Sequence, residues 1–184
     1  MPYGNLAKTL VANGYDFDIV NDDLLQNRAA FCNGRMEING HERYVLILPR
    51  AAVVPIETMR VIEKFVKNGG MVAALDELPA AAAGLKNHEK NDRELKQIVD
   101  RLFAGGSGAV FLPEYKIDRT PFSPMRQPYT PTPPLDDAQR RLLAVLGQVK
   151  PPDFAPAGRA QSDGLTFIHK QADGVDVYFV CNLQ

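Results

Sequence analysis

The stretch from Tyr44 to Asp76 constrains the fold more than any other part of the sequence. It opens with a short apolar run, Tyr44–Leu48, which is typical of a strand buried on both faces. A helix is predicted next, because Pro55 suits a first helical turn and a Gly-Gly pair at 69–70 suits its end. The second apolar run, Met71–Leu75, predicts a parallel strand and a right-handed βαβ crossover. The predicted helix has one apolar stripe, formed by Met59, Ile62, Phe65 and Val66.

The rest of the chain repeats this alternation of apolar runs and amphipathic segments. We expect helices over 5–13, 92–103 and 135–146, a short helix capped near Asn21, and turns at Asn33-Gly34 and Asn39-Gly40 around a short strand over 35–38. Residues 79–90 are expected to form a loop with a loose helical turn. Further strands are predicted over 15–20 and 109–112, and a closing antiparallel hairpin over 165–182 around an Asp-Gly turn.

This order of elements predicts an α/β fold. We expect a three-layer α/β sandwich around a mostly parallel sheet, with an antiparallel hairpin at the C-terminal end. The parallel strands are expected near Asp18, Leu46, Val72 and Val110.

We expect residues 1–184 to form a single α/β domain. The proline-rich run over 120–134 is either an ordered crossover or a linker, and the helix predicted after it favours the crossover. No strand precedes the first predicted helix, and the sequence stops soon after the hairpin. We therefore expect the chain to be a fragment of a larger multidomain protein.

Composition excludes several classes of partner. The formal net charge is −1, which gives no electrostatic reason to expect nucleic acid or an anionic membrane. No apolar run approaches the ~20 residues that span a bilayer. The two cysteines, Cys32 and Cys181, lack the spacing of metal ligands and are expected to be small buried apolar residues.

Acidic residues follow several predicted strands, where open α/β sheets bind their ligands. Asp22, Asp76 and Glu77 could line an acidic pocket for a sugar or a cation. The same residue types also serve as helix caps and solvated loops, and this interpretation is favoured. His169 shares a strand face with Leu165 and Phe167, so it is either a ligand contact or, more simply, a structural histidine.

No set of catalytic residues is evident. The glycine-rich segment 105–108 precedes a strand, so it is neither a nucleophile elbow nor a dinucleotide loop, and a phosphate loop is absent. Adjacent carboxylates on one loop do not supply the separated pair that glycoside hydrolysis requires. No histidine pair has metal-ligand spacing. We therefore expect no cofactor and name no catalytic residue.

Five segments, in this order, resemble a non-catalytic region of large bacterial α-L-rhamnosidases, glycoside hydrolase family 106. They are Leu10–Leu25, Tyr44–Pro49, Phe65–Gly70, Phe167–Lys170 and Asp176–Asn182. The resemblance covers nearly the whole chain. The first and last segments, with GYDFD-x-x-N and D-x-YFV-x-N, are the most specific, whereas FVKNGG is widespread in amidotransferase-like domains.

The resemblance implies a flavodoxin-type domain, similar to class I glutamine amidotransferases, that has lost the amidotransferase cysteine. In that family the catalytic acid and base belong to a separate (β/α)8 barrel, so no catalytic residue is transferred to this chain. Lys170 stands where the family usually has arginine, which weakens any contact role there. The resemblance also implies a parent enzyme that is exported from a bacterial cell.

Two functions from different classes follow. The first is an accessory domain of a glycoside hydrolase acting on plant-type polysaccharide, with the neighbouring domains of that enzyme as partners. The alternative is a stand-alone carbohydrate- or ligand-binding module that uses the acidic strand-end loops. An exposed apolar patch would favour the first, because an interdomain surface is apolar. A polar pocket at the strand ends would favour the second.

Overall fold

The computed structural model describes most of the chain and divides it into two compact units. The larger unit is Ile19–Lys116, and the smaller one combines Met1–Asp18 with Ile117–Gln184. Each unit is described by itself. The single domain expected over residues 1–184 stays a prediction. The described residues are 4–105, 108–118, 133–156, 165–172 and 174–182.

The larger unit is built on a parallel sheet in the order β4-β6-β8. Its strands are β4 (Val45–Pro49), β6 (Met71–Leu75) and β8 (Ala109–Leu112), and all three were predicted from their apolar runs. The central strand is the most deeply buried, since four of its five residues are buried. The α/β class and the mostly parallel sheet are therefore confirmed, whereas the flavodoxin-like relationship stays a prediction.

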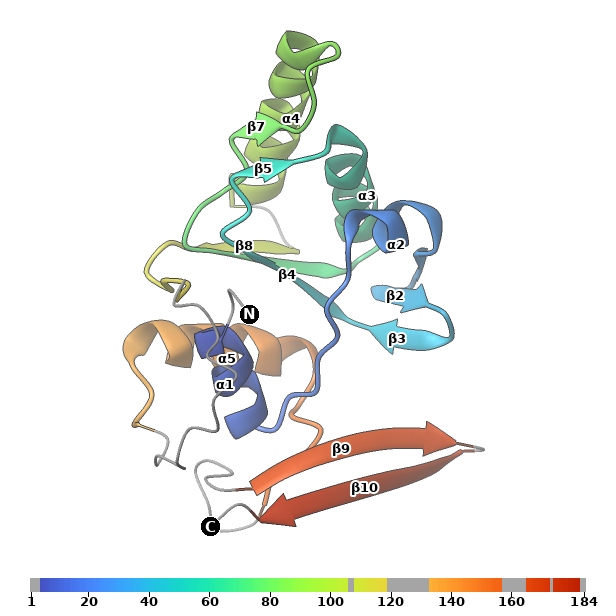
Figure 1. Ribbon diagram of the computed structural model, residues 1–184, viewed down its shortest axis with the longest axis vertical. Helices are drawn as coiled ribbons and strands as arrows, with labels where there is room; N and C mark the ends of the chain where they lie inside the picture. Colours follow the sequence, from blue (N-terminus) through green and yellow to red (C-terminus); the bar gives the residue numbers. More distant parts are fainter. Residues whose placement is uncertain (1–3, 106–107, 119–132, 157–164, 173, 183–184) are drawn as a thin grey trace. The chain divides into compact units, whose positions relative to one another are not determined.

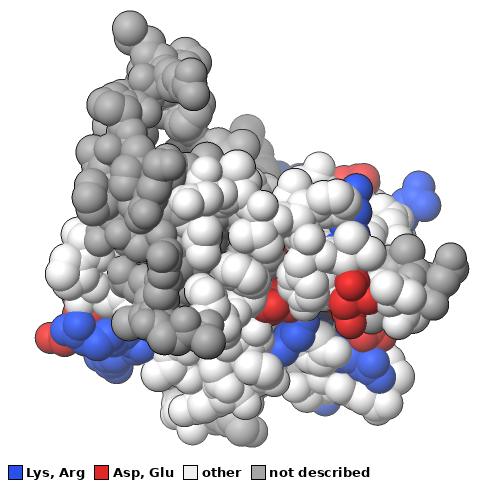
Figure 2. Space-filling model, turned by 90° about the horizontal axis from the view of Figure 1, so that it is seen from below, with Lys and Arg blue, Asp and Glu red and all other residues white. Residues whose placement is uncertain are grey.

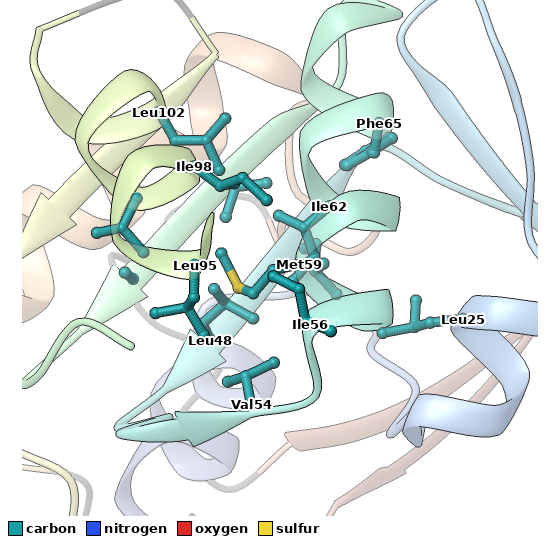
Figure 3. Close-up of a cluster of buried hydrophobic side chains, with 14 of the residues drawn as sticks. Leu25, Leu48, Val54, Ile56, Met59, Ile62, Phe65, Leu95, Ile98 and Leu102 are labelled. Carbon is teal, nitrogen blue, oxygen red and sulfur yellow. The ribbon is translucent and has the colours of Figure 1, made fainter. Parts of the chain in front are cut away.

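Two long helices cover one face of this sheet (Figure 1). They are α3 (Ile56–Lys67), which connects β4 to β6, and α4 (His88–Phe103), which connects β6 to β8. Each new strand in the order β4-β6-β8 is added beyond the previous one. Because such crossovers are right-handed, both connecting helices lie on the same face of the sheet. The predicted apolar stripe of α3 faces inward (Figure 3), and Met59 and Ile62 are fully buried against Leu95 and Ile98 of α4. Burial of each such side chain stabilises the unit by about 1.5–3 kcal/mol.

The predicted start and stop signals of α3 are confirmed. Pro55 occupies the N-cap position, and Lys67 lies in the last turn. Gly69 has a φ of 88°, and the Gly70 backbone N–H donates to the Phe65 carbonyl at 3.1 Å. This arrangement satisfies a carbonyl of the last helical turn and leads the chain directly into β6.

A short helix and a small antiparallel sheet precede β4. Asn21 caps α2 (Asp22–Asn27) as predicted, accepting a hydrogen bond from the Leu24 N–H at 2.9 Å. Positive φ values at Asn33-Gly34 and Asn39-Gly40 confirm both turns, because two-residue hairpin loops need this conformation. The strands they connect are β1 (Ala30–Cys32), β2 (Arg35–Ile38) and β3 (His41–Arg43). Cys32 is exposed at the end of β1, and Cys181 is exposed as well, so the burial expected for the two cysteines is wrong.

Between β6 and α4 the expectation of an irregular loop is partly wrong. A two-residue strand, β7 (Ala81–Ala82), pairs in parallel with β5 (Val53–Val54). The helix α4 begins at His88, four residues before the start predicted at Asp92. Residues 88–91 are polar and add nothing to the apolar stripe, so hydrophobic periodicity alone missed this first turn.

The strand predicted over 15–20 is wrong, and so is the parallel strand expected near Asp18. Backbone groups of this segment bond to a loop: the Phe154 N–H donates to the Gly14 carbonyl at 3.1 Å, and the Asp16 N–H donates to the Asp153 carboxylate at 3.2 Å. Ile19 is exposed, so the alternating pattern here does not mark a half-buried strand.

The smaller unit contains two helices and the predicted C-terminal hairpin. A capping box formed by Asp136 and Gln139 starts the second helix, and the Gln139 side chain also donates to Thr9 Oγ1 of the first helix at 3.0 Å. The hairpin is confirmed, with Leu165 opposite Asn182 and Ala172 opposite Val175. The elements are α1 (Gly4–Ala12), α5 (Asp137–Val149), β9 (Leu165–Ala172) and β10 (Val175–Asn182).

The expectation of a proline-rich crossover over 120–134 lies almost wholly outside the described residues. Within the part of the chain that the structure describes, no helix is both long and apolar enough to cross a membrane.

Candidate functional site

The carboxyl end of the parallel sheet brings Asp76 and Glu77 together with two cations. Arg50 follows β4, the two carboxylates follow β6, and Lys116 lies shortly after β8. The backbone hydrogen bonds between the parallel strands continue to this end of the sheet. The Arg50 N–H donates to the Leu75 carbonyl at 3.0 Å, and the Asp76 N–H donates to the Leu112 carbonyl at 3.2 Å. Neighbouring parallel strands therefore hold these side chains together at the carboxyl end of the sheet, which is where open α/β sheets bind their ligands.

The four side chains form a strand-end ion cluster, which we define as Arg50, Asp76, Glu77 and Lys116. Arg50 Nη1 lies 3.6 Å from Asp76 Oδ2, and Arg50 Nε lies 3.3 Å from Glu77 Oε2. Lys116 Nζ lies 3.0 Å from Asp76 Oδ1. Only 10% of the Asp76 side chain is exposed, so its charge needs these partners. Two carboxylates and two cations make the cluster formally neutral.

Two residues of this cluster have an unusual backbone conformation. Arg50 has a φ of 50° and Asp76 a φ of 67°, both in the left-handed region that few side chains favour. Each lies directly after its strand and redirects the chain there. The ion pair between the two side chains then connects the ends of β4 and β6, which is a structural role.

Chemically, the cluster lacks the arrangement that hydrolysis of a glycosidic bond requires. Such a reaction places a protonated acid and a second carboxylate on opposite sides of the bond, about 5–10 Å apart. Asp76 and Glu77 are adjacent in sequence, and both pair with the same guanidinium group. Two carboxylates that share one guanidinium group suit a structural ion cluster.

Asp22 takes no part in this cluster. It lies in the first turn of α2, and its carboxylate accepts a hydrogen bond of 2.6 Å from Thr58 Oγ1 of α3. Gln26 Nε2 donates to the same hydroxyl at 2.8 Å. Thr58 is buried, so Asp22 satisfies a buried polar group between two helices.

His169 belongs to the smaller unit and lies between two carboxylates. Its Nε2 is 2.8 Å from Asp176 Oδ1, and its Nδ1 is 4.0 Å from Asp153 Oδ1. The imidazole ring stacks on Tyr178, the residue opposite it in the hairpin, at a centroid distance of 4.4 Å. Lys150 also pairs with Asp153, at 2.9 Å. These contacts connect the hairpin to the loop after α5.

Several of these partners were not predicted from the sequence. Neither Arg50 nor Lys116 was named as a candidate. Asp176 could have been found from the hairpin register, because it lies near the residue opposite His169. Asp153 comes from a separate loop, and no local pattern indicates its position.

The described residues contain no evident metal site, and a surface hollow lies elsewhere than at the ion cluster. Within that part of the chain, no group of three or more histidines, cysteines, aspartates or glutamates is arranged to hold a metal ion. A surface hollow of ≈ 430 Å³ lies beside α4 rather than at the ion cluster. Its lining residues are Pro79, Ala80, Asp92, Arg93, Lys96, Val99 and Asp100. On the face drawn in Figure 2, acidic and basic side chains are interspersed.

Comparison with known proteins defines the class. The profile of the α-L-rhamnosidase family, glycoside hydrolase family 106, matches residues 4–184, so the chain belongs to this family of glycoside hydrolases. It is also similar to a putative beta-glucuronidase from Formosa agariphila, with 24% identity over 173 residues. The match covers 92% of this chain but only 12% of that relative. No solved structure matches the chain.

Proposed function

We propose that this chain is a non-catalytic, structural part of a larger bacterial glycoside hydrolase of the α-L-rhamnosidase family, acting on plant-type polysaccharide. The observation that carries the proposal is an apolar surface on the hairpin. Four large apolar side chains, Ile168, Val175, Val177 and Phe179, point away from the strand face that holds His169, and each is exposed. Apolar residues gathered on one exposed face are typical of a surface that contacts another domain.

The strand-end ion cluster supports the same proposal. Asp76 and Glu77 are the carboxylates at the ligand-binding edge of the sheet, and Arg50 pairs with both. Their task is then to hold the ends of β4 and β6 together. The acid and base of the parent enzyme would then lie in a domain outside this chain. The matched relative, of which this chain covers 12%, has ample length for such domains.

Substitution of the ion cluster in the full-length enzyme tests this role. The double variant Asp76→Asn/Glu77→Gln should hydrolyse an aryl α-L-rhamnoside with the wild-type kcat/KM, whereas loss of a catalytic acid or base costs roughly 10²–10⁴-fold. Its melting temperature should fall by several degrees, because Arg50 and Lys116 lose their anionic partners.

The reverse pattern would overturn the proposal. A large loss of kcat with an unchanged melting temperature would place these carboxylates in the chemistry. Glu89→Gln is the matched control, because this acidic residue lies in the first turn of α4, outside the ion cluster. It should change neither hydrolysis nor the melting temperature appreciably.

A further inference from the structure

The register of the hairpin sorts its side chains onto two faces. Residues directly opposite each other in an antiparallel pair point to the same side. Ile168 lies opposite Phe179, and Lys170 lies opposite Val177. With Val175 at the turn, these pairs define what we call the outer hairpin face: Ile168, Val175, Val177 and Phe179. Their exposed fractions are 58%, 59%, 38% and 58%.

The other face of the hairpin is already in use inside the smaller unit. Phe167 stacks on Phe154 with a centroid distance of 5.1 Å. His169 bonds to Asp176 there, and α1 packs against β9. The outer hairpin face is therefore the second side of a sheet whose first side makes these contacts through β9. On β10, Tyr178 and Val180 of that first side are also 43% and 49% exposed.

Among the described residues, β9 and β10 pair only with each other. Each strand runs for eight residues, which is long for an edge strand. Two-stranded hairpins are at best marginally stable alone, and a long apolar edge invites pairing with another strand. A helix would cover the face without pairing with an edge, whereas a partner that contains β-structure can pack a sheet on the face and add a strand to an edge.

We propose that the outer hairpin face is an interdomain surface, covered in the full-length enzyme by an apolar β-strand or β-sheet from a further domain of the same polypeptide. This inference rests on the proposed function, because it requires a longer parent chain. It deepens that proposal by naming the surface and the chemistry of its partner.

The size of the face favours a partner in the same polypeptide over a second copy of the chain. A fully buried aromatic side chain contributes about 150–250 Å², so one half-exposed phenylalanine and three aliphatic residues offer on the order of a few hundred Å². Stable complexes between separate chains bury about 800 Å² on each partner. A tethered domain is present at an effective concentration in the millimolar range, so a smaller contact is enough.

Hydrogen–deuterium exchange of the full-length enzyme tests this assignment. Peptides covering residues 165–182 should exchange at least about tenfold faster in Phe179→Asp than in the wild type, because the charge would expel the covering strand. Leu85→Asp is the matched control. Leu85 is also a large apolar residue and is 95% exposed, but it belongs to the larger unit. It should leave exchange of the hairpin unchanged.

Two results would overturn the inference. Equally fast exchange of the hairpin in the wild type and in Phe179→Asp would mean that nothing covers the face. Protection that depends on protein concentration, with a dimer in sedimentation that Phe179→Asp dissociates, would assign the face to a second copy. Faster exchange of α3 and α4 in the same variant would indicate general unfolding. In that event Phe179→Thr, which keeps β-propensity, must still expose the hairpin selectively.

Failure of this inference and failure of the proposed function give different signals. Hydrolysis of rhamnosides by the 184-residue chain alone would overturn the structural role, whatever the hairpin does. An unprotected hairpin in the full-length enzyme would overturn the surface assignment and leave the structural role intact.

Discussion

Two glycines with opposite surroundings show how single residues hold this fold. A Cβ built on Gly70 would lie 2.2 Å from the Phe65 ring, which is itself fully buried. Gly147 lies inside α5, and its Cβ would meet only the Tyr15 hydroxyl, at 3.7 Å. The same substitution should therefore have opposite effects at the two positions.

We predict that Gly70→Ala destabilises the larger unit by about 1–3 kcal/mol, because the phenyl ring must move out of a packed core. Gly147→Ala should instead stabilise α5 by about 0.5–1 kcal/mol, because alanine loses less backbone entropy in a helix. Urea unfolding followed by circular dichroism would measure both. Equal effects at the two sites would contradict the packing described around Phe65.

At the scale of elements, ion pairs join the two helices that cover the sheet. Glu63 of α3 lies 2.8 Å from Arg101 of α4 and 3.1 Å from Lys67. Burial raises the pKa of Glu63, but hydrogen bonds from Arg101 and Lys67 outweigh it, so the pKa is lowered overall. Hydrogen bonding from Arg60, the largest effect, likewise lowers the pKa of Glu94.

These lowered pKa values predict a stability that depends on pH. The unfolded chain binds the Glu63 proton more readily than the folded chain, so this contribution is present above the ordinary carboxyl pKa of 4.5 and is lost as the pH falls below it. The free energy of unfolding should therefore drop between pH 6 and pH 3, and less steeply in Glu63→Gln. Identical slopes in the two proteins would refute the role of this ion pair.

Most elements could be predicted from the sequence because their signals are local. The buried strands, the stripe of α3 and the Asn-Gly turns each depend on residues close together in the chain. The strand expected over 15–20 failed because its partners, Asp153 and Phe154, come from a distant loop. Likewise, the position of Asp76 at the end of the sheet could be predicted from the apolar run of β6. Its ion pair with Lys116 could not, because it depends on where the distant strand β8 ends.

At the scale of the whole molecule, the neutral ion cluster bears on ligand binding. Arg50 and Lys116 already compensate the charges of Asp76 and Glu77, so a calcium ion or an acidic sugar gains little there. In a thermal-shift screen of the chain, we expect no saturable rise in the melting temperature with rhamnose, galacturonate or calcium. A saturable rise that Asp76→Ala/Glu77→Ala abolishes would support a stand-alone binding module instead, since ligand binding stabilises the native state.

The exposed outer hairpin face predicts how the 184-residue chain behaves in solution. Ile168 and Phe179 present apolar surface on a sheet that has only the strands β9 and β10 among the described residues, so the chain should self-associate as its concentration rises. Sedimentation velocity would detect this, and Phe179→Asp should shift the population towards monomer. Association that is unchanged by this substitution would locate the contact elsewhere.

The most direct test of a non-catalytic role compares the 184-residue chain with the full-length enzyme on an aryl α-L-rhamnoside. We expect hydrolysis only by the full-length enzyme, because Asp76 and Glu77 at the sheet edge form ion pairs with Arg50 and Lys116. Turnover by the purified chain, abolished by Asp76→Asn, would contradict this expectation and make the strand-end ion cluster an active site.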